Sequence, residues 1–233
     1  MGGIDFTFSN GAPSNPTSLH TQTGRNQYMA SLKAVTEILN QYDSDKKYPI
    51  YGFGGIPEFM NWSHVSHCFP LNGNVVNPSL EGVEGVMAAY QDNVNNIKFM
   101  GPTHFADLLK ECRKQVKECK NEKMYHILMI LTDGEIHDID ETIAEISEMA
   151  KENLPVSIVI IGVGNEEFSN MVRLDGDDVA LVAGVKDIVQ FVKYEDVVRR
   201  SQPAELAGNL GALVLDEIPS AMVKCFMDKN MLP

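Results

Sequence analysis

The sequence predicts a doubly wound α/β fold, in which helices flank a mainly parallel sheet. Apolar runs of strand length alternate with segments whose apolar residues recur at helical spacing, and this alternation is typical of such sheets. The run Val156–Val163 is apolar on both faces, as expected of a strand in the middle of a parallel sheet. With 233 residues, of which 44% are hydrophobic, the chain can bury one sizeable core, and we expect a single domain over residues 1–233.

The first half of the chain begins with a short strand at Ile4. Because side chains alternate along a strand, Phe6 and Phe8 are expected to pack on one face of it. A stretch rich in Gly, Pro, Asn and Ser follows and predicts a loop. Helical spacing then indicates a helix from Tyr28 to about Tyr42. The next expected elements are a strand at Tyr48–Phe53, short strand-like pieces such as His67–Phe69, and a helix at Leu80–Val94.

The second half repeats the strand and helix alternation and ends in a long amphipathic segment. Proline cannot continue a helix interior, so the closing helix at Ala204–Met227 is expected to be interrupted near Pro219. Its apolar stripe is typical of core, although a docking surface has the same pattern. That stripe comprises Val214, Ile218, Met222 and Phe226. The other expected elements are helices at Thr103–Lys117, Ile139–Lys151 and Phe168–Val172, and strands at His126–Thr132, Val156–Val163 and Ile188–Val192.

The formal net charge of −13 excludes function classes that need a basic surface. Nucleic-acid binding requires clustered lysine and arginine, and anionic lipid attracts the same residues. No apolar run approaches the roughly 20 residues needed to span a bilayer, and the amino terminus lacks the features of an export signal. The scattered cysteines are expected to be reduced thiols. We therefore expect a cytoplasmic protein, whose oligomeric state the sequence leaves open.

Oxygen-bearing side chains gather at the ends of two expected strands. Asp5, Thr7 and Ser9 alternate along the opening strand and can point the same way, while Asp133 follows the strand His126–Thr132. Ligands of doubly wound sheets bind beyond the carboxyl ends of the strands where the strand order reverses, so both acids would meet if these strands are neighbours there. Thr103 supplies a further hydroxyl from a loop. Two carboxylates and three hydroxyls are hard-oxygen ligands suited to Mg²⁺ or Mn²⁺.

Each of these patterns has a less specific interpretation. The opening motif alone could be a turn whose polar side chains bind backbone groups. Two glycine-rich stretches, Gly52–Gly55 and Gly162–Gly164, lack the full phosphate-loop spacing and predict strand-end turns. The acidic stretch with Asp175, Asp177 and Asp178 lacks the alternating ligands of a calcium loop, and a solvated turn is the favoured reading.

The opening motif, the loop threonine and the stretch after the strand His126–Thr132 together resemble the pattern of a known family. Asp5-Phe6-Thr7-Phe8-Ser9, Thr103 and Thr132-Asp133-Gly134 resemble the metal-ion-dependent adhesion site of von Willebrand factor A domains, whose pattern is Asp-x-Ser-x-Ser, a loop Thr and a strand-end Asp. Thr7 stands at the first Ser position and keeps the hydroxyl. Further stretches resemble the A domain of copines, so that the resemblance covers nearly the whole chain. These stretches are Tyr42–Lys46, Gly82–Met87, Leu174–Asp178, Asp187–Val192 and Glu217–Pro233.

The copine resemblance implies an intracellular protein-interaction domain. In A domains the motif side chains contact a divalent ion directly or through water, and an acidic group of the partner often completes the coordination. The resemblance assigns these roles to the five residues already singled out. It also implies that the chain is one domain of a longer protein that has two upstream calcium-dependent phospholipid-binding modules. The protein would reach membranes only through those modules. The zinc-binding RING of related plant ubiquitin ligases has no counterpart among the Cys and His residues of this chain.

An enzyme of the same sheet topology is the alternative. Asp5 would be the nucleophile of a Mg²⁺-dependent phosphohydrolase or phosphotransferase, with Asp133 holding the ion. Such enzymes usually carry a second Asp two residues after the nucleophile, where this chain has Thr7. No lysine is evident at a strand end to neutralise the phosphoryl group, since Lys123 precedes its strand. The sequence therefore favours a binding module without enzymatic activity.

Overall fold

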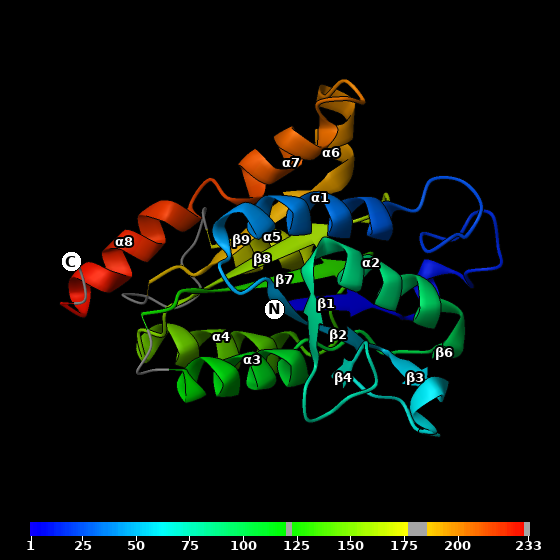
Figure 1. Cartoon of the computed structure of the whole chain (residues 1–233), viewed down its shortest axis with the longest axis horizontal. Helices are drawn as coiled ribbons and strands as arrows, with labels where there is room; N and C mark the ends of the chain where they lie inside the picture. The colour runs from blue at the N-terminus through cyan, green and yellow to red at the C-terminus, as the bar shows by residue number, and fades with distance from the viewer. Residues whose placement is uncertain (120–122, 177–185, 231–233) are drawn as a thin grey trace.

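A mainly parallel sheet forms the middle of the molecule, with helices on both faces (Figure 1). The computed structural model describes residues 1–119, 123–176 and 186–230. The strand order is β4-β2-β1-β7-β8-β9, with β5 also paired to β2, and β3 pairs separately with β6. The bounds are β1 Gly2–Asp5, β2 Lys47–Phe53, β3 Gly55–Pro57, β4 Phe69–Pro70, β5 Ser79–Glu81, β6 Ile97–Phe99, β7 His126–Thr132, β8 Val156–Gly162 and β9 Val189–Lys193.

The strand order reverses between β1 and β7, and this reversal makes the sheet doubly wound. From β1 the chain continues to the parallel neighbour β2 on one side. On the other side β1 pairs in parallel with β7, which is followed outward by β8 and β9. The predicted fold class is confirmed. The opening strand and His126–Thr132 are neighbours, which is the condition under which the two acids were expected to meet.

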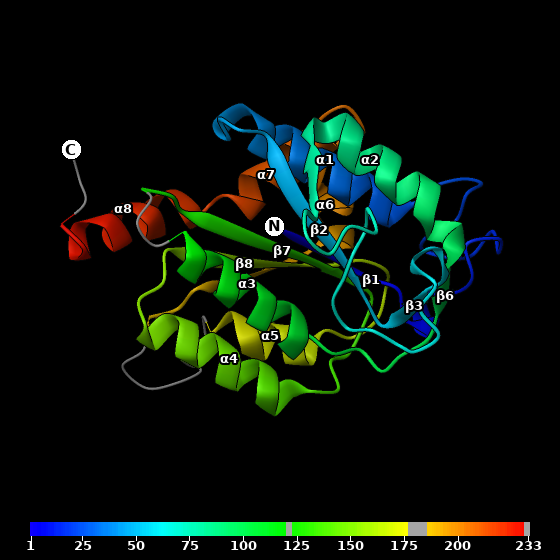
Figure 2. The ribbon, with the colours of Figure 1, turned by 60° about the horizontal axis from the view of Figure 1, so that its bottom comes forward.

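Helices cover the two faces of the sheet in separate layers (Figure 2). Side chains alternate along β7, so that Met129 and Leu131 enter one core while Leu128 and Ile130 enter the other. One layer contains α1 (Gln27–Tyr42), α2 (Gly82–Asn93), α6 (Tyr194–Arg200) and α7 (Leu206–Val214), and the other contains α3 (Ala106–Glu118), α4 (Ile139–Lys151) and α5 (Ser169–Asp175). A last helix, α8, spans Ile218–Asp228.

The opening segment differs from its prediction in one functionally important respect. The strand ends at Asp5, Thr7 forms only an isolated bridge with Met100, and Phe8–Asn10 is a single 3-10 turn, η1. As a result Phe6 is fully buried, whereas Phe8 is 80% exposed. The prediction that both phenylalanines pack on one face is therefore wrong for Phe8, because the turn rotates it out of the strand's alternation.

Several other boundaries also differ from the sequence-based ones. Leu80 belongs to β5 rather than to a helix, and α2 begins only at Gly82. The short strands β3 and β6 and the helix α6 were not predicted. The closing helix is two helices, and Pro219 lies in the first turn of α8, where its missing N–H leaves no hydrogen bond unmade.

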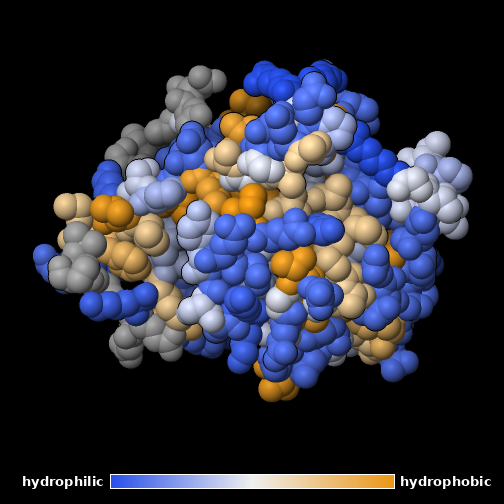
Figure 3. Space-filling model, turned by 45° about the horizontal axis from the view of Figure 1, so that its top comes forward, coloured by the Kyte–Doolittle hydropathy of each residue, from blue (hydrophilic) through white to orange (hydrophobic). Residues whose placement is uncertain are grey.

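The final helix exposes part of its apolar surface. Val214 and Ile218 of the predicted stripe are buried, but Met222 and Phe226 are only half-buried. Val223 and Met227 of α8 are exposed. Apolar side chains gather at the left end of the space-filling view, where α8 lies (Figure 3). The stripe is thus core at its start and partly surface along α8.

A close helix contact holds α7 against α1. Gly211 of α7 faces Ile38 of α1, and a Cβ added at Gly211 would lie 1.6 Å from Ile38 Cδ1. Gly208, one turn earlier on the same helix, has no other atom within 4 Å of the position of such a Cβ. Of these two glycines of α7, Gly211 is therefore the one whose lack of a side chain the packing on α1 requires.

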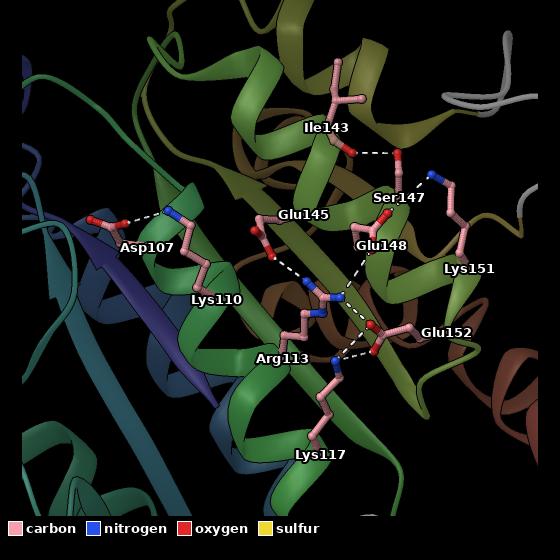
Figure 4. Close-up of polar contacts among 10 residues, drawn as sticks. All are labelled: Asp107, Lys110, Arg113, Lys117, Ile143, Glu145, Ser147, Glu148, Lys151 and Glu152. Carbon is pink, nitrogen blue, oxygen red and sulfur yellow. Dashed lines mark hydrogen bonds and ion pairs between the residues drawn. The ribbon is translucent and has the colours of Figure 1, made fainter.

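An ion-pair network joins α3 to α4 on the opposite face (Figure 4). Arg113 of α3 contacts Glu145, Glu148 and Glu152 of α4, its separation from Glu145 being 3.4 Å. Lys117 adds a 2.6 Å contact to Glu152. Arg113 and Glu145 are about one fifth exposed, with side-chain exposures of 21% and 19%, so this pair is less screened than the ion pairs on the open surface.

Candidate metal centre

Two acidic residues meet at the carboxyl edge of the sheet. Asp5 ends β1, and Asp133 directly follows the neighbouring strand β7. A ladder of hydroxyls joins them: Thr7 Oγ1 donates to Asp5 Oδ1 over 2.6 Å, and Ser9 Oγ donates to Asp133 Oδ1 over 3.0 Å. The two hydroxyl oxygens lie 3.0 Å apart. The structure thus brings four of the five predicted ligands together.

Asp5 is fully buried, and both of its oxygens accept hydrogen bonds. The Thr7 amide donates to Oδ1 over 2.8 Å, and Thr132 Oγ1 donates to Oδ2 over 2.6 Å. Asn10 Nδ2 lies 3.4 Å from Oδ1. The hydrogen bond from the Thr7 amide is the contact expected if the opening motif were only a turn whose side chains bind backbone groups. The structure has both this contact and the hydroxyl ladder. Sequence reasoning missed the roles of Thr132 and Asn10, because Thr132 reaches Asp5 only through the register of β1 on β7.

Thr103 lies in the loop that precedes α3. Its amide donates to His137 Nδ1 over 3.3 Å, and the His137 amide donates to the Thr103 carbonyl over 2.9 Å. The start of this loop runs beside the η1 turn, since Phe8 N donates to Met100 O over 2.7 Å. In the described ranges the Thr103 hydroxyl makes no hydrogen bond with the other four predicted ligands. The structure therefore brings the loop to the site without joining this side chain to the ladder.

Asp138 anchors the same loop from the start of α4. Its carboxylate accepts the Phe105 amide over 3.0 Å and the Ala106 amide over 2.8 Å, so that it satisfies the free N–H groups at the start of α3. An Asp directly before a helix predicts a cap for that helix. Here the side chain serves mainly the neighbouring helix, which the sequence does not reveal.

His20 fixes the backbone of Asp5 from the other side. Its ring is buried and stacks on Tyr28 with centroids 3.9 Å apart. Nε2 lies 2.8 Å from the Asp5 carbonyl and Nδ1 lies 2.7 Å from the Tyr90 hydroxyl. Burial lowers the pKa of His20 to about 3, so the imidazole is neutral and donates from Nε2. His20 therefore positions Asp5 without adding a positive charge.

The two acids lack a cationic partner in the part of the chain that the structure describes. Burial raises the pKa of Asp5, although hydrogen bonds from Thr132 and Thr7 oppose this effect. Burial and then the charge of Asp5 raise the pKa of Asp133 to about 7, against the opposing hydrogen bond from Ser9. Two buried carboxylates in such surroundings repel each other when both are ionised. A bound divalent cation would remove that repulsion.

The donor set fits a small divalent ion. When the Thr7 and Ser9 protons go to the carboxylates, each hydroxyl oxygen still has a lone pair for an ion, although Asn10 Nδ2 also donates to Thr7 Oγ1 over 3.3 Å. Adjacent ligands of an octahedral Mg²⁺ ion, at 2.0–2.1 Å from the metal, are about 2.9 Å apart. The 3.0 Å between the two hydroxyl oxygens matches this spacing. Ser9 is exposed, so the site opens toward solvent on its side.

The other candidate sites of the sequence do not gather ligands. Gly54 and Gly164 follow β2 and β8 with positive φ, as strand-end turns do. Asp175 Oδ1 accepts the Phe191 amide over 2.6 Å, while Asp177 and Asp178 lie outside the described residues. No group of three or more His, Cys, Asp or Glu side chains is placed to hold a metal within residues 1–119, 123–176 and 186–230. The candidate centre depends on hydroxyls as well as on its two carboxylates.

Comparison with known proteins identifies the family. A family model described as Copine matches residues 18–233. Copine-A of Dictyostelium discoideum is 44% identical over 235 residues, which cover 97% of this chain. The chain belongs to the copine family. It spans 37% of the length of Copine-A, so the copine domain described here corresponds to about a third of that relative.

Solved structures similar to this copine domain have the von Willebrand factor A fold. The A domain of SpRpn10 gives a TM-score of 0.53 at 14% identity and covers 90% of this chain and 92% of its own. Manganese-loaded TRAP protein of Plasmodium vivax gives 0.54 at 14% identity over 87% of this chain and 70% of its own. Proximal thread matrix protein 1 of the mussel byssus, with a zinc-occupied MIDAS motif, gives 0.51 at 17% identity over 93% and 47%. At these identities the likeness shows the fold.

Two further expectations can be compared with the structure. The cysteines carry thiols rather than disulfides, as predicted: Cys68, Cys112, Cys119 and Cys225. None of the described helices combines the length and the apolar character needed to cross a bilayer.

Proposed function

We propose that this copine domain is a divalent-metal-dependent protein-binding module. Asp5, Thr7, Ser9, Thr103 and Asp133 would hold the ion, and a carboxylate of the partner protein would complete its coordination. The observation that carries the proposal is the pair of buried carboxylates joined by two hydroxyls 3.0 Å apart, with no ion pair to either acid among the described residues.

The charges of the site support an acidic ligand. Two carboxylates neutralise one divalent ion, and hydroxyls and waters add no charge. Because the remaining ligands add no negative charge, the bound ion can still accept a further oxygen anion in its coordination sphere. A protein with a net charge of −13 would otherwise repel an acidic partner, so binding should require the metal.

Mg²⁺ or Mn²⁺ is the proposed ion. Carboxylate and hydroxyl oxygens are hard ligands, which suit these ions better than they suit zinc. Structures of the same fold with manganese or with a zinc-occupied MIDAS motif are consistent with a divalent metal in this fold.

Burial and hydrogen bonding argue against the enzyme alternative. A nucleophilic carboxylate needs an oxygen that can reach the substrate. Asp5 has no exposed surface, and both of its oxygens accept short hydrogen bonds. Position 7 carries a threonine instead of an acid that could transfer protons. We therefore propose that the domain has no phosphohydrolase or phosphotransferase activity.

Calorimetric titration of Mg²⁺ and Mn²⁺ tests the metal site. The wild type should give saturable heats that vanish in the double variant Asp5→Ala, Asp133→Ala. A matched control is Asp43→Ala with Asp45→Ala, which removes two acids at the opposite edge of the sheet and should leave the titration unchanged. Circular dichroism shows whether each variant is folded. Equal heats from the wild type and the first double variant would end the metal proposal.

The role in the cell is proposed from the family. We expect a cytoplasmic protein that binds intracellular target proteins and reaches membranes in a calcium-dependent way, through modules outside these 233 residues. Vesicles that contain phosphatidylserine should therefore retain the full-length protein in calcium, but not this domain alone. Calcium-dependent retention of the isolated domain would contradict this assignment.

A further inference from the structure

A large apolar side chain faces solvent inside the metal motif itself. Phe8 lies between Thr7 and Ser9 and is 80% exposed. A single exposed apolar residue needs no explanation, but Phe8 has an apolar neighbour. Met100, 37% exposed, is held beside it by the hydrogen bond from Phe8 N to Met100 O and by the bridge between Thr7 and Met100.

The backbone prevents Phe8 from turning into the core. The η1 turn is closed by hydrogen bonds from Asn10 N to Thr7 O and from Gly11 N to Phe8 O, of 3.2 Å and 3.1 Å. The neighbouring hydroxyls of Thr7 and Ser9 both point to the acids. Burying Phe8 would therefore require that the hydroxyl ladder come apart. Wherever the candidate site is intact, an aromatic ring stands at its rim.

The charge around the site limits what else the partner can offer. Glu166 is exposed and lies four residues beyond β8, whose carboxyl end pairs with that of β7 next to Asp133. Glu135 and Glu167 lie nearby in sequence and are exposed. A second acidic group of the partner would be repelled by these residues, since the ion can accept only the first. Additional affinity is best supplied by apolar contact.

We propose that Phe8 and Met100 form an apolar subsite beside the metal, and that the partner is a protein segment with an apolar side chain one to three residues from its metal-binding carboxylate. The proposal rests on the function proposed above. Phe8 and Ser9 are adjacent, so their Cα atoms are 3.8 Å apart, and an extended segment advances about 3.3 Å per residue. A partner whose carboxylate reaches the ion near Ser9 therefore brings its next few side chains over Phe8.

Selection of displayed peptides provides the test. A random 12-residue library is selected on immobilised wild type in Mg²⁺, and on the variants Phe8→Ala and Asp5→Asn. Peptides from the wild type should carry Asp or Glu with an aromatic or aliphatic residue within three positions. Peptides from Phe8→Ala should keep the acidic residue and lose the apolar preference. Asp5→Asn should enrich neither.

Fluorescence anisotropy then measures the coupling between the two apolar groups. Phe8→Ala should weaken the best peptide about tenfold, which corresponds to about 1.4 kcal/mol. Replacing the apolar residue of the peptide by Ser should weaken wild-type binding to a similar extent and Phe8→Ala binding little further. The matched control is Tyr42→Ala, an aromatic residue 77% exposed at the end of α1, which should change nothing. The peptide substitution uses the wild-type protein, so it remains decisive if Phe8→Ala folds poorly.

The outcomes separate this subsite from the metal proposal. Peptides with an acidic residue but no apolar enrichment would overturn the subsite and leave metal-dependent binding intact. Absence of Mg²⁺-dependent enrichment on the wild type would count against both. Retention of the domain on phosphatidylserine vesicles that depends on Phe8, without any apolar preference in peptides, would assign the ring to a membrane and overturn the proposal.

Discussion

Replacing Asp133 by asparagine should stabilise the metal-free protein. Asp133 is 2% exposed, shares the site with buried Asp5, and has no ion-pair partner in the described residues. Asparagine has nearly the same shape and keeps an oxygen that can accept the hydrogen bond from Ser9. The substitution therefore removes a buried negative charge with little change in packing. Asp5→Asn lacks this advantage, because the Asp5 carboxylate accepts several hydrogen bonds.

The magnitude follows from the pKa of Asp133. Burial and the neighbouring Asp5 raise this pKa from 3.8 to about 7 in the folded chain. A carboxyl group with a raised folded pKa destabilises the fold above that pKa, and the destabilisation fades as the pH falls through 7 toward 3.8. At pH 8 the difference corresponds to about 4 kcal/mol. Because the hydrogen bond from Ser9 is weaker when its acceptor is neutral, we expect a net gain of about 2–3 kcal/mol for Asp133→Asn.

Urea denaturation with EDTA and with Mg²⁺ measures this effect. In EDTA at pH 8 the variant should be more stable, and its advantage should shrink by about 1 kcal/mol between pH 8 and pH 6 as the folded wild type takes up a proton. Protonation of His20 in the unfolded chain also lowers the stability below about pH 6.5, but it does so equally in both proteins. Saturating Mg²⁺ should stabilise the wild type by about 2.7 kcal/mol at a concentration of 100 Kd, and the variant less. A variant less stable in EDTA, or equal gains from Mg²⁺, would refute the reasoning.

Three further substitutions test the framework around the site. Gly211→Ala should destabilise the fold by about 1–3 kcal/mol in urea denaturation because its Cβ collides with α1, whereas Gly208→Ala should stabilise it by up to about 1 kcal/mol. Arg113→Met should lower the stability by about 1–2 kcal/mol at low ionic strength and less in 1 M NaCl, since it removes the contacts between α3 and α4. Asp138→Ala should reduce the stability by about 3 kcal/mol and weaken Mg²⁺ binding several-fold in calorimetry, because it frees the loop that carries Thr103.

Each substitution has a control and an outcome that contradicts it. Gly208→Ala is the control for Gly211→Ala. Equal changes in stability at the two positions would show that helix propensity, and not the contact with α1, determines the effect. Lys33→Met breaks a single exposed ion pair and should change the stability by less than about 0.5 kcal/mol; an equal loss would deny the network any special role. Asp140→Ala removes an exposed acid at the start of the same helix as Asp138, and should leave Mg²⁺ affinity unchanged. Unaltered Mg²⁺ affinity in Asp138→Ala would show that the loop held by Asp138 does not contribute to metal binding.

The fold could be predicted because its signals are long and regular. The runs His126–Thr132 and Val156–Val163 are apolar over at least two pleats on each side, and the first agrees with β7 to the residue. The short strands β3 and β6 have three residues each, which is too few for a period to be visible. The break between α7 and α8 was placed at Pro219, but proline is tolerated in a first helical turn and so marks the start of α8.

The candidate site was predicted in its members but not in its supports. Asp5 ends one apolar strand and Asp133 follows another, which the sequence shows directly. Thr132 reaches Asp5 through strand register, and Asp138, at the start of α4, reaches the start of the neighbouring helix α3. Both contacts depend on how the elements pack, and no spacing in one sequence encodes that. Thr103 was found by motif order alone, and its ligation stays a prediction.

The backbone of the opening motif explains why its second phenylalanine matters. In an extended strand, side chains two residues apart point the same way but are separated by about 6.6 Å, too far for both to ligate one small ion. The η1 turn instead brings the Thr7 and Ser9 hydroxyls to 3.0 Å. The same turn necessarily carries the residue between them outward, so the geometry that suits the metal also exposes Phe8. A site built on a continued strand would bury this ring and keep its hydroxyls apart. The exposure of Phe8 is therefore a consequence of the metal-binding arrangement. For this reason we propose that the ring contacts the partner protein whose carboxylate approaches the ion.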